Sequence, residues 1–227
     1  MAKIFLLRIG ETQANLDGKL SNFSPLTEDG IGQAYRARDF LKYYELPAVF
    51  SSEIDSAIKT AEIVAEPHGL KLEKCKEFDE INLGIWDGMT KSSIAEQYSE
   101  GWQSFLSNPT NDDRMIPSGE TFQEVADRVM PKLETLSQKF DPTTICIVAH
   151  GFVNRVIMCS LLGLQLTDVW KFDQFNTAIN MFEYSRGKVR FQGINWTGHL
   201  YDAGEVKINA DSITGKPWTL KALGHHA

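Results

Sequence analysis

The stretch "FLLRIGETQAN", residues 5–15, joins an apolar run to a polar, glycine-containing loop. The apolar run, residues 3–7, is continuous rather than alternating, which is typical of a short strand buried on both faces of a sheet. Arg8 and Gly10 follow it directly, so the stretch has the form of a strand that ends in a phosphate-binding loop. Ile9 occupies the place where such a loop would present a reactive side chain.

A second segment of the same kind is "TTICIVAHG", residues 143–151, which is apolar until it ends at His150 and Gly151. Apolar residues then recur at helical spacing over residues 153–162. Repeated strand, loop and helix predict a single-domain, three-layer α/β/α fold with a mostly parallel sheet covered on both faces. Functional groups in such folds collect at the carboxyl ends of the strands, where Arg8 and His150 both fall.

The remaining segments predict further elements of this fold. We expect helices over 28–44 and 57–68, strands over 47–53 and 188–196, an edge or third strand within 69–78, and mostly helix between 90 and 140. The domain is expected to span residues 1–200, with a C-terminal extension, 201–227, that packs on it or on a partner subunit.

The composition argues against several classes of function. The net charge of −7 argues against a general nucleic-acid binder, because such proteins gather cations into a basic face. No apolar run reaches the roughly 18 residues that a membrane span needs, so we expect a cytoplasmic protein without membrane contact. The three cysteines have no metal-binding spacing and no nucleotide-binding glycine motif occurs, so neither a metal nor a cofactor is expected.

Several segments, in order, resemble the histidine phosphatase superfamily, which has the phosphoglycerate-mutase-like fold. The matching segments, which cover about residues 3–200, are "LLRIGETQAN", "SPLTEDGIGQA", "VFSSEIDSAIKTA", "FDEINLGIWDG", "PSGETFQEVADRV", "IVAHGFVNRV" and "NWTGHL". The resemblance implies a nucleophilic histidine at position 9, where this chain has Ile9, and a phosphate-binding arginine at position 56, where it has Ser56. A hydrocarbon side chain has no lone pair, so a phosphohistidine cannot form at position 9.

Three polar residues of the family pattern are kept. The resemblance makes Arg8 a phosphate-binding arginine, Glu80 the general acid and His150 the second histidine of the pocket. We predict that these three form the catalytic group, because they fall at matching positions around one pocket. The predicted substrate-binding residues are Ile9, Thr12, Asn15, Ser56, Arg114 and Gly151.

These substitutions predict a degenerate phosphatase site that uses Glu80 and His150 as an acid/base pair on a small carboxylated or phosphorylated metabolite. An isomerase, lyase or hydrolase would each fit, and the apolar Ile9 is expected to raise the pKa of Glu80. One alternative is a non-catalytic pseudophosphatase that binds an anionic ligand or a protein partner. Another is a conventional phosphatase or mutase inactivated by substitution. The expected partner is a small-molecule substrate, and assembly with further copies of the chain is left open.

Overall fold

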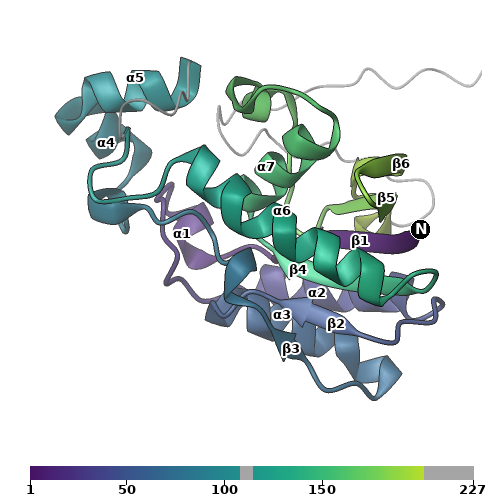
Figure 1. The fold of residues 1–227 in the computed structure, drawn as a ribbon. Coiled ribbons are helices and arrows are strands. Elements are labelled where there is room, and N and C mark those ends of the chain that lie inside the picture. Colours follow the sequence, from purple (N-terminus) through teal and green to yellow (C-terminus); the bar gives the residue numbers. More distant parts are fainter. Residues whose placement is uncertain (108–114, 202–227) are drawn as a thin grey trace, which may run out of the picture.

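The central feature of the computed structural model is a six-stranded sheet in the order β3-β2-β4-β1-β5-β6 (Figure 1). Strands β1 to β4 run parallel to one another, whereas β5 and β6 pair antiparallel at one edge. The structure describes residues 1–107 and 115–201. The predicted α/β fold with a mostly parallel sheet is therefore confirmed. The expected extension, 201–227, lies outside the described residues except for Tyr201.

The two inner strands are the two apolar runs of the sequence. β1 (Ala2–Arg8) and β4 (Thr144–Ala149) pair in parallel with a register that sets Arg8 against Ala149. Because both strands have helices on both faces, nearly all their side chains are buried. This register brings the ends of the strands, and thus Arg8 and His150, to the same edge of the sheet.

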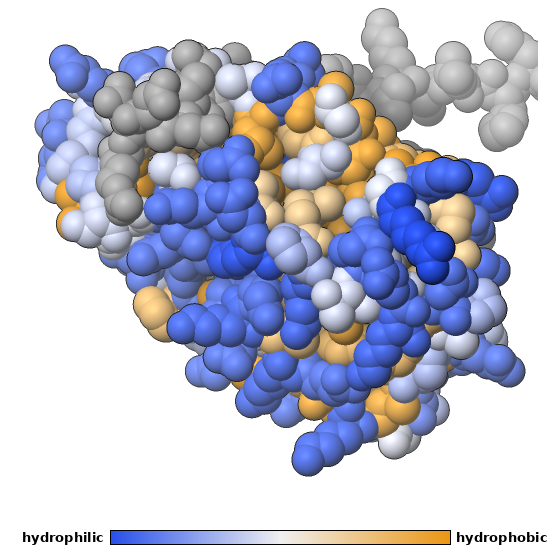
Figure 2. All heavy atoms as spheres, in the orientation of Figure 1, coloured by the Kyte–Doolittle hydropathy of each residue, from blue (hydrophilic) through white to orange (hydrophobic). Residues whose placement is uncertain are grey.

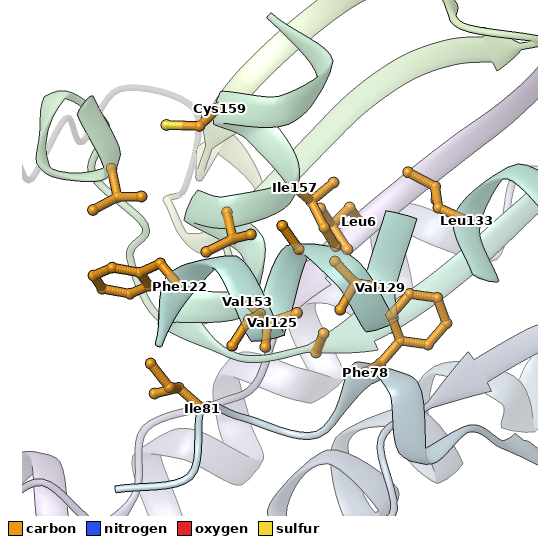
Figure 3. Packing of buried hydrophobic residues seen from close by; sticks show 14 of the residues in the cluster. Leu6, Phe78, Ile81, Phe122, Val125, Val129, Leu133, Val153, Ile157 and Cys159 are labelled. Carbon is orange, nitrogen blue, oxygen red and sulfur yellow. The ribbon is translucent and has the colours of Figure 1, made fainter. Parts of the chain in front are cut away.

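Helices cover both faces of the sheet. α2 (Glu28–Leu41) and α3 (Asp55–Ala65) lie on one face, and α6 (Phe122–Lys139) and α7 (Gly151–Leu161) lie on the other (Figure 1). Side chains alternate along β1, so that Leu6 joins the core beneath α6 and α7, whereas Leu7 joins the core against α2 and α3. Figure 3 shows the first core, where Leu6 lies among side chains of α6 and α7. Truncating such a leucine to alanine typically costs about 2–5 kcal/mol.

Further helices, strands and turns complete the fold. They are α1 (Gln13–Leu16), β2 (Val49–Ser51), β3 (Glu73–Lys74), α4 (Lys91–Gln97), α5 (Ser99–Ser107), β5 (Ile179–Ser185) and β6 (Lys188–Trp196), with 3-10 turns at Glu66–His68, Lys76–Phe78, Gly84–Trp86, Leu166–Lys171 and Gly198–Leu200. The edge strand expected within 69–78 is reduced to two residues, which pair with Phe50 and Ser51 of β2. The helix expected over 28–44 ends at Leu41.

The surface is mostly hydrophilic on the face drawn in Figure 2, and hydrophobic residues gather in its upper part, where Figure 1 draws α7. Within residues 1–107 and 115–201, no helix combines the length and the apolar character that crossing a membrane requires.

Candidate functional site

A cavity of about 910 Å³ opens at the carboxyl ends of the parallel strands. Eight of the nine residues that the sequence predicts for the site line it: Arg8, Ile9, Thr12, Asn15, Ser56, Glu80, His150 and Gly151. The ninth, Arg114, lies outside the described residues. The structure thus brings residues from the ends of β1 and β4, from the first turn of α3 and from the loop before Gly84 into one cavity.

Arg8 supplies a buried cation to this cavity. Its side chain is 7% exposed, and Nη1 donates a hydrogen bond to the main-chain carbonyl of Gln174. Its buried Nε has no hydrogen-bond partner within the part of the chain that the structure describes. Burial, and then the nearby charge of Arg155, lower the pKa of Arg8 to about 10. The guanidinium therefore stays charged at neutral pH and keeps one donor available.

The loop after β1 is held by a close approach of two glycines. A Cβ atom on Gly10 would overlap the carbonyl oxygen of Gly30, and a Cβ on Gly30 would overlap that of Glu11, so the loop and the start of α2 fit only with glycine at both places. The hydroxyl of Thr60 accepts a hydrogen bond from the Gly10 N–H at 3.3 Å. This packing fixes Arg8 and Ile9 relative to α2 and α3.

Thr12 and Asn15 line the cavity but also bond to each other. The Asn15 side chain accepts from the Thr12 N–H at 3.0 Å, and the Thr12 hydroxyl accepts from the Asn15 N–H at 3.4 Å. This reciprocal pattern is a capping box, which satisfies two N–H groups at the start of α1. Both residues therefore shape the rim of the cavity through backbone contacts.

Glu80 caps the N-terminus of α7, the helix that follows β4. Its carboxylate accepts hydrogen bonds from the N–H groups of Phe152 and Val153, at 3.0 and 3.1 Å, and from that of Ile81 at 3.0 Å. Ile81 and Val153 also share the core cluster drawn in Figure 3, so apolar packing supports the cap. A carboxylate at a helix N-terminus is stabilised by the exposed N–H groups and the helix dipole.

Two opposing effects act on the pKa of the Glu80 carboxyl group. Burial raises the pKa of this carboxyl above its ordinary value, and the three N–H donors and Arg8 act in the opposite direction. Burial is the largest effect, so the protonated form persists to a higher pH than in an exposed glutamate. The direction expected from the sequence is thus found, with burial as its main cause.

His150 is a buried, neutral imidazole. Its Nε2 lies 2.6 Å from the hydroxyl of Ser52, and 3% of the residue is exposed. Burial, and then the charges of Arg8 and Arg128, lower the pKa of His150 to about 3. At neutral pH this ring takes part in hydrogen bonding without carrying a charge.

Ile9 and Ser56 line an uncharged part of the cavity. Ile9 is 8% exposed and packs with Leu7 and Ala57 in the core against α2 and α3. Ser56, in the first turn of α3, is 4% exposed. A ligand at this part of the cavity meets a hydrocarbon surface and a single hydroxyl.

Two site residues were missed in the sequence. Arg155 lines the cavity from α7, where its Nε donates to the Phe172 carbonyl at 2.9 Å and its guanidinium lies 5.7 Å from the Trp170 ring centre. It follows Gly151 by four residues, and this one-turn spacing on a helix could have indicated it. Ser52, the partner of His150, directly follows β2 and could have been found as a third strand end.

The fold and the cavity define a class: an α/β protein with a mostly parallel sheet, in which two arginines, a histidine and a carboxylate line one cavity at the strand ends. Comparison with known proteins makes the class specific. Residues 4–197 match the Histidine phosphatase superfamily (branch 1), and the chain belongs to that family.

Relatives in the family carry several activities. A probable phosphoglycerate mutase, GpmB, from Salmonella choleraesuis is 28% identical over 190 residues, which are 83% of this chain and 87% of that protein. Bacillus stearothermophilus YhfR superposes with a TM-score of 0.82 at 26% identity, covering 88% of this chain and 100% of that one. A phosphoserine phosphatase mutant from Entamoeba histolytica, in complex with phosphoserine, gives a TM-score of 0.78 at 27% identity, with 88% and 100% covered.

Proposed function

We propose that this protein binds a small phosphorylated or carboxylated metabolite in the strand-end cavity and acts on it without forming phosphohistidine. The observation that carries the proposal is the buried Arg8, whose Nε lacks a hydrogen-bond partner in residues 1–107 and 115–201. Leaving a donor of a buried charged group unpaired is costly, so an anionic oxygen from a ligand would complete the site.

Ile9 supports a route without a covalent phosphoenzyme. The family resemblance assigns the histidine that attacks phosphorus to this position, and the isoleucine side chain here packs against Leu7 and Ala57 beside Arg8. Loss of the nucleophile in a covalent mechanism typically lowers turnover by about a million-fold. Any turnover would therefore come from the retained groups acting directly on a bound molecule.

Glu80 is the proposed proton-transferring group. Its raised pKa brings the protonated form closer to neutral pH, and it lines the same cavity as Arg8. His150 has a pKa of about 3, so we assign it a neutral hydrogen-bonding role instead of the role of a base. The acid/base pair expected from the sequence is thereby reduced to one titrating residue, Glu80.

Relatives support the class of ligand. The Entamoeba phosphatase is seen with phosphoserine and also with 3-phosphoglyceric acid, both of which carry a phosphate and a carboxylate on a short carbon chain. A ligand of this size fits a cavity of about 910 Å³.

A second function, non-catalytic binding, is favoured by the contacts of Glu80 itself. Both carboxylate oxygens already accept hydrogen bonds from the backbone, so the group has a structural role even without a reaction. A pseudophosphatase would keep Arg8 for its ligand and Glu80 for the start of α7. The two functions differ in one measurable property, which is turnover.

A panel of small phosphomonoesters and hydroxycarboxylates tests the proposal, with turnover followed by NMR and binding by calorimetry. We expect Arg8→Met to abolish binding, and Glu80→Gln to abolish turnover while binding remains. The matched controls are Arg190→Met and Glu45→Gln, which change exposed residues outside the cavity. Turnover that survives in Glu80→Gln would contradict the proposed role of Glu80, and binding without any turnover would establish the pseudophosphatase.

A further inference from the structure

Arg8 and Arg155 approach the same point of the strand-end cavity. A Cβ atom on Gly151 would lie 3.5 Å from Arg8 Nε and 3.6 Å from Arg155 Nη1. All three residues line the cavity, and the two arginines are 7% and 2% exposed. The two buried guanidinium groups therefore face one small region beside Gly151.

Main-chain carbonyls of one short segment, residues 172–174, hold both guanidinium groups. Arg155 Nε donates a hydrogen bond to the Phe172 carbonyl at 2.9 Å, and Arg8 Nη1 donates to the Gln174 carbonyl. A carbonyl oxygen accepts a hydrogen bond without carrying a net charge. These bonds therefore orient the two cations and leave their positive charge in place.

The segment that carries these carbonyls is itself fixed by a buried pair of amides. Gln174 Nε2 donates to Asn180 Oδ1 at 3.1 Å, and Asn180 Nδ2 donates to Gln174 Oε1 at 2.8 Å. Both residues are fully buried, and Asn180 belongs to β5, which pairs with β1. Reciprocal hydrogen bonds of this kind make a buried site rigid, so the two arginines are positioned before a ligand binds.

The two arginines are close enough to repel each other. Burial is the main cause of the lowered pKa of Arg8, the like charge of Arg155 is the next cause, and Glu80 acts in the opposite direction. An anion bound beside Gly151 would be attracted by both guanidinium groups and would offset their repulsion.

Position 56 gives a reason for a second cation from another element. The family resemblance implies a phosphate-binding arginine at this position, where the chain has Ser56, which also lines the cavity. A guanidinium offers a planar set of donors and a permanent charge, which a hydroxyl does not. Arg155 brings such a group into the same cavity from α7.

We propose that Arg155 is a second anion-binding residue, which acts together with Arg8 and makes the site selective for dianionic over monoanionic groups. This inference rests on the proposed function for the presence of an anion, and it adds the residue that selects the charge of that anion. Each positive charge attracts a dianion about twice as strongly as a monoanion at the same distance, so a pair of cations separates the two kinds of group.

Methyl phosphate and methyl sulfate test the proposal, because they have similar shapes but at pH 8 the first is a dianion and the second a monoanion. We expect calorimetry on the full chain to show that methyl phosphate binds at least about tenfold more tightly. In Arg155→Met this preference should fall to about twofold or less, whereas Arg155→Lys, which keeps the charge, should retain most of it. The control variant Arg190→Met changes an exposed arginine outside the cavity and should keep the preference.

A purely structural role of Arg155 would lower both affinities by the same factor, and an unchanged preference in Arg155→Met would overturn the proposal. Equal affinities for the two esters in the unchanged protein would overturn it as well. If the methionine variant does not fold, Arg155→Gln takes its place, because its amide can still donate to the Phe172 carbonyl, and the same loss of preference is expected.

The outcomes also separate this inference from the proposed function. Methyl phosphate that binds equally well with and without the Arg155 charge would refute the role of Arg155 alone. If neither ester binds the unchanged protein, the proposed function is wrong and this inference is wrong with it.

Discussion

Glu80 accepts a hydrogen bond from the main-chain N–H of Phe152 at 3.0 Å, although 72 residues separate them in the sequence. The bond attaches the candidate acid to the first turn of α7, the helix that begins immediately after His150. The protonation of Glu80 and the stability of this helix end are therefore linked. Any experiment on Glu80 has to measure both.

The first prediction concerns the pH dependence of stability in Glu80→Gln. Because folding raises the pKa of Glu80, the folded state favours the protonated form, and the contribution of this residue to stability is lost as the pH rises through the folded pKa. Glutamine carries no such charge, but it cannot accept all three N–H bonds, which costs about 1–3 kcal/mol. We expect the stability advantage of the unchanged protein over Glu80→Gln to be larger at pH 4 than at pH 8 in urea unfolding. An advantage that grows with pH would contradict the assigned shift.

The second prediction has the opposite sign and concerns His150→Gln. Burial and two arginines lower the pKa of His150 to about 3, so its unfolded form binds a proton more readily than its folded form. The stability that His150 contributes is present above its ordinary pKa of 6.5 and is lost as the pH falls towards 3.

Relative to His150→Gln, the unchanged protein should therefore lose up to about 1.4 kcal/mol per pH unit below pH 6. Unfolding curves of both proteins over this pH range provide the measurement. A difference that stays constant between pH 6 and pH 4 would show that the ring is not held neutral.

The third prediction concerns position 9. Incubation with a phosphomonoester should leave the unchanged protein without acid-labile phosphate, because Ile9 offers no lone pair for a bond to phosphorus. If the chain descends from a conventional phosphatase, the double variant Ile9→His/Ser56→Arg should acquire both acid-labile phosphate and phosphatase turnover. Intact-mass spectrometry at alkaline pH detects the adduct, and Ile9→Ala serves as a cavity control. Acid-labile phosphate on the unchanged protein would contradict the proposed route without a phosphoenzyme.

The central fold could be predicted because its signals are local. Each of β1 and β4 is a continuous apolar run that ends in a polar residue, and Arg8 and His150 lie where those runs stop. Parallel strands that pair in register bring such ends together, so the shared cavity followed from the two segments. An edge strand within 69–78 was predicted and is found as β3, but its length of two residues could not be read from the local sequence, because it pairs only with the end of the short β2.

Contacts between segments that lie far apart along the chain could not be predicted from the sequence. Arg155 reaches the cavity only because α7 turns that face towards Arg8, and the Glu80 cap requires two loops to meet.

The last prediction concerns a polar residue with no assigned role, Asn154. Its side chain is fully buried in α7, and neither amide atom has a hydrogen-bond partner in the described part of the chain. Burying an unpaired amide typically costs about 1–3 kcal/mol, and a leucine has nearly the same size.

Asn154→Leu should therefore raise the free energy of unfolding by about 1–2 kcal/mol, which urea titration measures. The affinity for phosphate should not change, because Asn154 does not line the cavity at the strand ends. Asn154→Asp is the matched control and should destabilise the protein, since it buries a charge at the same place. A destabilised leucine variant would contradict this prediction and would show that the amide has a hydrogen-bond partner in solution.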